Sequence, residues 1–461
     1  MAKSNHPKTR LRPRRGVAAA VILGAAALGA WGAWSRSGAS PARIRQEIEA
    51  DLRAGRYEHA AAALARLGNL TPRDHMLKAQ AAKALRRPDQ ALVELARIPD
   101  GDPAAPGARL LAGQIELQRD CVRRAAAALS AALALDPTLV QAHRQLIYIN
   151  GILLRRRELN EHFQALARLA PLTFHEVFSW CLTRNTVWEP HESARDLKRF
   201  LAADPDDRWS RAALAETLRR IGRRDEAADV LAVLPESDPD ARVVRARIAL
   251  DQGDDRRADA ILAGGPPDHV ELAQLRGQFA LAHHDAPAAV RHFRAAYAAL
   301  PDNRDTVFGL GTALALVGDH AAAAPFLRDA KSYDTLAALL TRAANPASQN
   351  DPALVRAIGA ACESVHRLPE ARAWYNLAVQ INSLDEEAQK ALYRLRMPAA
   401  PPSTDTAPPA DGQHSAGIRT ARSPARLPRR VRVLSLVQTR PLPRQARARD
   451  LILNSGLVTR G

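Results

Sequence analysis

Evenly spaced prolines are the feature of this chain that most constrains its fold. Five of them stand 34 residues apart, at Pro103, Pro137, Pro171, Pro205 and Pro239, and Pro267 and Pro301 repeat the same step after one shorter interval. Because proline disrupts the interior of a helix, such spacing divides the chain into helical segments of similar length. A fixed period of this size is typical of stacked helical hairpins. The period predicts an elongated array and directs the search for function to a surface.

The units defined by these prolines share small and large apolar positions. Counted 31 residues back from the prolines, they begin at residues 41, 72, 106, 140, 174, 208, 239, 270, 304 and 352. Position 24 is large and apolar in every unit: Leu64, Leu95, Leu129, Phe163, Leu197, Leu231, Leu262, Phe293, Leu327 and Tyr375. Position 20 is mostly alanine: Ala60, Ala91, Ala125, Ala227, Ala258, Ala289, Ala323 and Ala371. Residues four apart share one helix face, so we expect the small residue to admit a neighbouring helix and the large one to fill the space beside it.

Two further positions repeat in the first half of the unit. Position 8 tends to be small, as in Gly277, Gly311, Gly359 and Cys181. Position 15 often carries a glycine that suits a left-handed turn between helices, as in Gly55, Gly222, Gly253 and Gly318. The units from 140 and 174 depart most from the pattern. The first has Ile147 and Leu159 at small positions, and the first helix of the second fits poorly.

On these residues the chain resembles the tetratricopeptide repeat (TPR) family, in which glycine, alanine, a large apolar residue and proline recur at the same positions. The best-matching segments are 105–139 and 351–385, and the resemblance covers about three-quarters of the chain. It implies an all-α solenoid of about ten repeats over residues 41–385, interrupted at about 333–349. In the interruption we expect a short helix that starts after Asp334 and ends at Asn345-Pro346. A capping helix over 386–397 is expected to cover the end of the stack.

The net charge of +17 is concentrated at the two ends of the chain. Residues 1–16 carry +6 and residues 398–461 carry +8, which leaves +3 for the 381 residues between them. A superhelix that follows phosphates is expected to carry a basic stripe. The nearly neutral array therefore argues against nucleic acid as a partner of the repeats. The Pro- and Arg-rich tail at 398–461 is predicted to be disordered. It is either a binder of acidic surfaces or nucleic acid or a terminus without function.

The N-terminal charges precede an apolar segment that predicts a membrane anchor. Residues 17–34 are uncharged and end in a tryptophan pair, Trp31 and Trp34. As a helix they span about 27 Å, near the lower limit for a bilayer. The basic flank at 1–16 predicts a cytoplasmic N-terminus and repeats in the periplasm of a bacterial-type inner membrane. The alternative is cleavage near Ser37-Gly38-Ala39, which gives a periplasmic or secreted protein.

No recognisable catalytic, metal or cofactor motif occurs in the chain, so we expect neither enzyme activity nor a cofactor. The three cysteines, Cys121, Cys181 and Cys362, are widely separated and form no CxxC. One disulfide is permitted in an exported chain, but the spacing does not predict it, and buried small residues are the favoured interpretation. His283-His284-Asp285 falls at a position-15 turn, where adjacent histidines do not converge on one metal ion.

The resemblance implies a binding surface, because the first helix of each family repeat lines the concave face. The matching positions here name ten candidate protein-binding residues: Arg144, Tyr148, His175, Asn185, Trp209, Glu216, Arg219, Gln274, Gln278 and Phe308. An extended peptide or a helix would lie along such a face. We therefore expect a non-catalytic, membrane-anchored scaffold for protein–protein interactions in envelope assembly, with the lipid bilayer contacted by residues 17–34. A small-molecule substrate is not expected.

Overall fold

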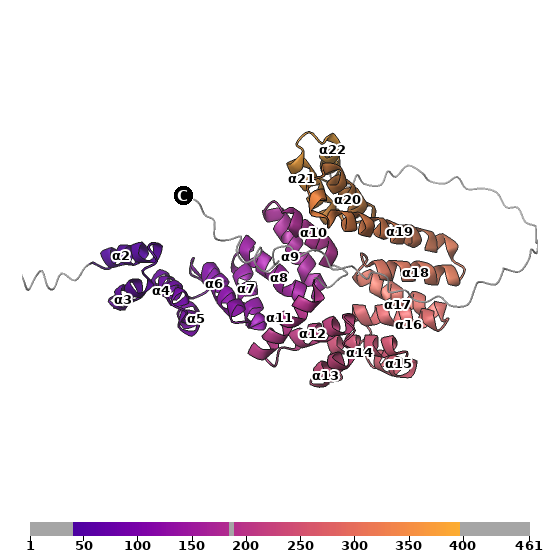
Figure 1. The fold of residues 1–461 in the computed structure, drawn as a ribbon, viewed down its shortest axis with the longest axis horizontal. Coiled ribbons are helices and arrows are strands. Elements are labelled where there is room, and N and C mark those ends of the chain that lie inside the picture. The colour runs from indigo at the N-terminus through magenta and orange to yellow at the C-terminus, as the bar shows by residue number, and fades with distance from the viewer. Residues whose placement is uncertain (1–39, 184–188, 397–461) are drawn as a thin grey trace, which may run out of the picture. The chain divides into compact units, whose positions relative to one another are not determined.

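The computed structural model describes residues 40–183 and 189–396 (Figure 1). These residues form helices α2 to α22 and one 3-10 helix, and none of them lies in a strand. The predicted all-α repeat fold is confirmed. The predicted flank at 1–16, anchor at 17–34 and tail at 398–461 lie outside the described residues. Within the described part, no helix has both the length and the apolar character needed to cross a bilayer.

The helices alternate as first and second members of hairpins. The first helices are α2 (Pro41–Arg53), α4 (Pro72–Ala84), α6 (Ala105–Gln118), α8 (Val140–Ile152), α10 (Phe174–Thr183), α12 (Arg208–Arg220), α14 (Pro239–Gln252), α16 (Val270–Ala282), α18 (Arg304–Leu316) and α20 (Pro352–Ser364). The second helices are α3 (Tyr57–Ala65), α5 (Pro88–Ala96), α7 (Val122–Leu135), α9 (Arg156–Leu169), α11 (Pro190–Ala203), α13 (Arg224–Ala232), α15 (Asp255–Ala263), α17 (Ala286–Ala299), α19 (His320–Ala343) and α21 (Leu368–Ile381). The 3-10 helix η1 (Pro346–Ser348) precedes α20, and α22 (Glu386–Arg396) packs on α21. Every first helix begins within one residue of the unit start that the sequence indicates.

The small and large positions pack as expected. All eight alanines at position 20 are at most 1% exposed. Nine of the ten large residues at position 24 are at most 3% exposed. A Cβ added at Gly277 would stand 2.9 Å from the ring of Phe293, and one at Gly359 would stand 2.9 Å from Tyr375. Distances this short leave no room for a side chain, so position 8 is small because position 24 of the same hairpin presses on it.

A left-handed residue ends the first helix of nearly every hairpin. The four glycines at position 15 have φ between 72° and 89°. Five other residues at this position are also left-handed, with φ between 57° and 63°: Arg86, Asp120, Leu154, His284 and His366. The predicted turn at His283-His284-Asp285 is therefore confirmed, and Asp285 caps α17 by accepting from the Ala288 backbone N–H at 3.0 Å. The hairpin requires the left-handed turn whether or not glycine supplies it.

The interruption at 333–349 differs from the expectation. Asp334 caps no separate helix, because α19 continues unbroken for 24 residues to Ala343. No helix-breaking residue lies between Pro325 and Ala343, so the Ala- and Leu-rich segment extends the helix. Asp334 instead binds Arg304 of α18, with Arg304 Nε donating to Oδ1 at 2.9 Å. Leu327, the one exposed position-24 residue at 37%, lies on this helix.

The chain divides into two compact units, which we describe separately. The first comprises the described residues up to Gln118 together with 134–137. Its helices α2 to α6 enclose two small cores, one around Ile48 and Leu64 and one around Leu95 and Ile98. A buried ion pair joins α2 to α4, because Arg45 Nε and Nη2 each donate to a carboxylate oxygen of Asp74 at 2.8 Å.

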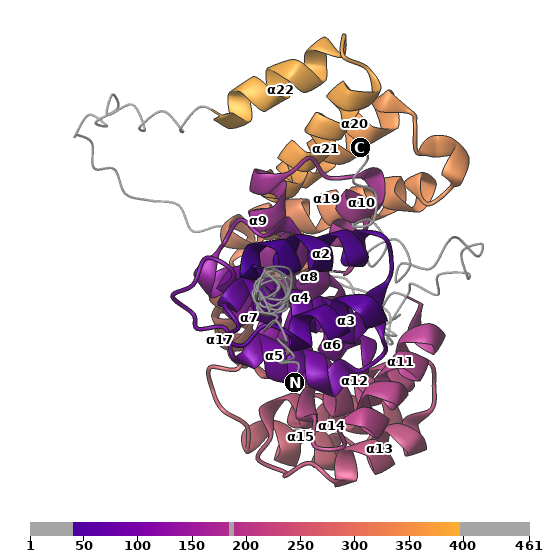
Figure 2. The same ribbon diagram turned by 90° about the vertical axis from the view of Figure 1, so that its left-hand side faces the viewer.

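The second unit contains α8 to α22 and closes on itself. Its early helices α9 and α10 pack against α21 near its end, as Figures 1 and 2 show. Trp374 of α21 donates through Nε1 to Cys181 Sγ of α10 at 3.2 Å. Cys181 Sγ also lies 3.9 Å from Cys362 Sγ of α20, 181 residues along the chain. We call this contact of α9 and α10 with α20 and α21 the closure. It buries Trp180 and Trp374 completely in one shared core.

Candidate binding surface on the first helices

The packing of the second unit identifies its inner side. The first helices α12, α14, α16 and α18 each pack against the next first helix. The second helices α13, α15 and α17 make weaker contacts with one another. In a curved stack, elements on the inner side lie closer together than those on the outer side. The first helices therefore form the inner face, where the candidate residues were expected.

Trp209 lies at the start of α12 beneath two arginines. The guanidinium carbon of Arg155 stands 4.5 Å from the ring centroid, and that of Arg208 stands 5.3 Å from it. Both distances suit cation–π attraction. Arg208 is also bound to Asp238, whose Oδ2 accepts at 2.7 Å. The half-buried indole is thus held in a fixed orientation on the inner face.

Glu216 and Arg219 belong to a buried set of paired charges. Glu216 is 3% exposed and receives Arg219 Nε at 2.9 Å and Arg220 Nε at 2.7 Å. Arg247 of α14 approaches its Oε1 at 3.4 Å. Burial alone would raise the pKa of Glu216, but the charges of Arg247 and Arg219 outweigh it and place this pKa well below the ordinary range. Glu216 is therefore an ionised anchor for three arginines.

The same set extends along α14 and α16 and includes one residue of α9. We call it the inner charge cluster: Arg156, Glu216, Arg219, Arg220, Arg247, Asp251 and Glu271. Burial lowers the pKa of Arg156 to about 10, with a further lowering by the charge of Arg220 that Glu271 opposes. Arg156 donates to the backbone oxygen of Thr183 at the end of α10. The cluster thus ties α9 and α10 to α12, α14 and α16.

The candidates near the start of the unit are partly engaged in pairs. Arg144 Nε donates to Glu176 Oε1 at 2.7 Å, which links α8 to α10. Tyr148 is buried and its hydroxyl donates to Asp196 of α11 at 3.4 Å. His175 is exposed and its ring meets that of Phe174 edge-on. Asn185 lies outside the described residues.

The candidates on α16 and α18 are more open. Gln274 is half-buried and donates to Asn303 Oδ1 at 3.5 Å, whereas Gln278 is exposed. Phe308 is 46% exposed, and the Arg304 guanidinium carbon stands 5.4 Å from its ring centroid. An exposed phenyl ring beside an amide and an arginine offers both apolar area and hydrogen-bond donors to a partner. The structure does not test whether any of the ten candidates contacts one, so these assignments stay predictions.

Three arginines of this surface were missed by the position rule. Arg155 and Arg156 sit at the turn into α9, outside the first-helix positions that the family uses. Arg247 was passed over although it occupies the same unit position as Glu216. The run Arg155-Arg156-Arg157 directly after an apolar helix was an available signal. Basic side chains concentrated at a hairpin turn need carboxylate partners, and Glu216 and Glu271 lie on neighbouring first helices.

The arrangement is suited to binding rather than to bond chemistry. In residues 40–183 and 189–396, no three histidines, cysteines, aspartates or glutamates are grouped to hold a metal ion. The inner charge cluster contains four arginines and three carboxylates, so its charge is nearly balanced. Its role in the geometry is to fix the helices that carry Trp209, Gln278 and Phe308. Such rigid support lowers the entropic cost of binding a partner.

Comparisons with known proteins agree with the repeat. Residues 189–248, from α11 into α14, match the family model described as tetratricopeptide repeat. No curated protein matches the chain. Solved structures with a similar fold include the APC/C hetero-tetramer Cut9–Hcn1, at 14% identity over 77% of this chain and 96% of that chain, with a TM-score of 0.29. The human IFIT1 dimer with PPP-AAAA is 14% identical over 76% of this chain and 92% of that chain, with a TM-score of 0.31.

A tetratricopeptide repeat protein from Parabacteroides merdae is 15% identical over 53% of this chain and 98% of that chain, with a TM-score of 0.28. Scores this low carry no argument about partner or arrangement. The family model and the ten helix pairs with shared small, large and left-handed positions carry the assignment. This chain is a tetratricopeptide repeat protein, a class whose members generally mediate protein–protein interactions.

Proposed function

We propose that this protein is a membrane-anchored, non-catalytic scaffold that holds a segment of another protein along the inner face of α12 to α18. The observation that carries the proposal is the placement of Trp209, Gln278 and Phe308 on first helices that pack in series. Ring faces, an amide and neighbouring arginines are the side chains that recur at protein-binding hot spots. An extended or helical segment is the partner that suits a row of this kind.

The near-balanced charge of this face supports a partner of mixed character. The carboxylates of the inner charge cluster are already shared among its arginines, so the cluster itself offers little net charge. Apolar contact with Phe308 and hydrogen bonding by Gln278 would then contribute most of the affinity. A strongly acidic or strongly basic segment gains less here than an amphipathic one.

Site-specific photo-crosslinking tests the surface. A photoreactive amino acid replaces Gln278 or Phe308 on the inner face, and matched variants carry it at Asp229 of α13 or Ala295 of α17, both exposed on second helices. We expect discrete crosslinked proteins from the inner positions and none of the same species from the second-helix positions. Equal crosslinking from both faces would contradict the proposal, since it shows that no face is preferred.

The membrane placement is tested separately. The apolar segment at 17–34 and the basic flank at 1–16 support an anchor with the repeats in the periplasm. Reporter fusions after residue 40 and at residue 390 should both report a periplasmic location, and cytoplasmic activity of either would exclude it. Sequencing of the mature N-terminus separates the retained anchor from the alternative, because a start near Ser40 shows cleavage.

A further inference from the structure

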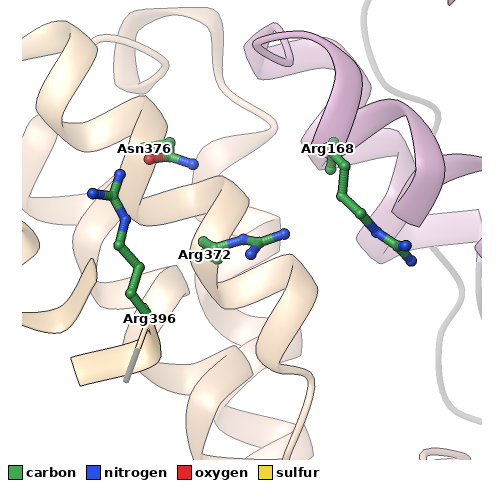
Figure 3. Close-up of a pocket in the computed structure, with 5 residues that line it drawn as sticks. Arg168, Arg372, Asn376 and Arg396 are labelled. Atoms are coloured by element: carbon green, nitrogen blue, oxygen red, sulfur yellow. The ribbon is translucent and has the colours of Figure 1, made fainter. Parts of the chain in front are cut away.

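The closure creates a pocket that the first-helix surface does not include. It has a volume of about 280 Å³ and is lined by Ala167 and Arg168 of α9, Arg372 and Asn376 of α21, and Arg396 at the end of α22. Figure 3 shows Arg372 extending from α21 toward α9, and Arg396 directed toward Asn376. The lining contains no aromatic ring and no carboxylate. Three guanidinium groups therefore define its chemistry.

The three arginines differ from their neighbours because they lack acidic partners. Arg157 of α9 pairs with Glu161 at 3.1 Å, and Arg394 of α22 pairs with Glu363 at 2.8 Å. Among the described residues, Arg168, Arg372 and Arg396 make no hydrogen bond or ion pair. Arg168 and Arg396 lie in the last turns of their helices, where positive charge is favourable. Arg372 lies in the second turn of α21, where the helix dipole offers no such stabilisation.

Three unpaired like charges around one opening repel each other, and an anion between them removes that repulsion. Guanidinium groups bind carboxylates through two parallel hydrogen bonds, and the amide of Asn376 adds a further donor. The volume lies just below the range of about 300–1,000 Å³ typical of small-ligand pockets. It admits one or two carboxylates but no large apolar group. Arg168 and Arg396 are exposed, so a side chain borne by another polypeptide can reach the pocket.

We propose that this pocket is an oxyanion site that binds the carboxylates of an acidic segment of a partner protein. The shared chemistry is a doubly charged oxyanion, which a free phosphate also presents. The open rim and the protein-binding character of the repeat family favour the carboxylate source. The site lies on second helices and α22 and uses none of the ten candidate residues. It is therefore independent of the proposed inner-face function, and either can fail alone.

Fluorescence anisotropy of labelled hexaglutamate with the full-length protein tests the site. We expect Arg372→Gln to weaken binding by about fivefold, the upper range for one partly exposed ion pair. Arg328→Gln is the matched control, because Arg328 is exposed on α19 outside the pocket and the substitution removes the same charge. This control should change the affinity by less than about twofold. Arg372→Lys keeps the charge without the two-pronged geometry and should recover part of the loss.

The remaining arms separate the outcomes. Arg396→Gln alters only the exposed end of α22 and should reproduce the loss if Arg372→Gln disturbs folding. Equal weakening by Arg372→Gln and Arg328→Gln would overturn the proposal, since it shows general attraction to a basic chain. Inorganic phosphate that binds in an Arg372-dependent manner, with no binding of hexaglutamate, would overturn the acidic segment and assign the pocket to phosphate. Crosslinking from Gln278 and Phe308 should be unchanged in Arg372→Gln.

Discussion

The ring of Phe293 is held in a slot between two glycines, which makes a sharp test of how consecutive repeats meet. Phe293 of α17 is completely buried. A Cβ at Gly277 of α16 would lie 2.9 Å from three of its ring atoms. A Cβ at Gly309 of α18 would lie closer than 3.0 Å to three ring atoms on the other side. The ring therefore cannot retreat from one helix without striking the other.

We predict that Gly309→Ala destabilises the second unit by about 2 kcal/mol. Adding a methyl group to a filled site costs about 1–3 kcal/mol, and the trapped ring places this site at the upper end. The higher helix propensity of alanine offsets about 1 kcal/mol of that cost. Gly151→Ala in α8 is the matched control, because the nearest heavy atom to its new Cβ would be Leu159 Cδ1 at 3.9 Å. It should stabilise the unit by about 1 kcal/mol.

Urea unfolding followed by tryptophan fluorescence measures both variants. In the described part of the chain all tryptophans, Trp180, Trp209 and Trp374, belong to the second unit. Phe293→Leu should be less damaging in the Gly309→Ala background than alone, because the smaller side chain leaves space for the methyl group. The reasoning is refuted if Gly309→Ala raises the stability as much as Gly151→Ala does.

Four other predictions follow from single contacts. His284→Gly should stabilise the second unit by about 1 kcal/mol in urea unfolding, because His284 has a φ of 63° that glycine adopts without strain. Refolding with oxidised glutathione should join Cys181 to Cys362, as two thiols yield one disulfide and two reduced glutathiones; peptide mass spectrometry that finds both thiols free would contradict the closure. Glu216→Gln should cost about 2 kcal/mol in the same unfolding assay, since Arg219 and Arg247 each keep another carboxylate while Arg220 loses its own. The hydrogen bond from Arg45 lowers the pKa of Asp74 from 3.8 to about 2, so its stabilisation is complete above about pH 4 and is lost toward pH 2. Acid titration of helicity should show this loss in the wild type and not in Asp74→Asn.

Much of the repeat could be predicted from the sequence because its determinants are local. Ala289 and Phe293 are four residues apart on one helix, so their shared face follows from helix geometry alone. Both are completely buried in the structure. The glycine signal for the turn was also local, but it identified only part of the left-handed positions. At Leu154 and His366 the packing of two helices imposes the turn on residues that do not favour it.

The binding surface was less predictable, because it depends on contacts between hairpins. The position rule placed Glu216 and Arg219 on the inner face but gave no indication that they bind each other at 2.9 Å. It also excluded Arg156, which reaches the same cluster from the start of α9. A rule written for one repeat treats each candidate as free. Charges on neighbouring repeats then neutralise the candidates that the rule selects.

The closure shows how a departure from the repeat can be interpreted. Ile147 and Leu159 occupy positions that other units keep small, and both lie in the core that includes Trp374. A small residue at these positions serves the packing of one hairpin, whereas a bulky one extends beyond it. Their bulk is therefore explained by a second surface, which α20 and α21 provide. The sequence alone does not pair segments so far apart, because loop closure carries no local signal. A repeat that abandons its shared positions marks the place where a solenoid meets something other than its neighbour, and in this chain that is its own far end.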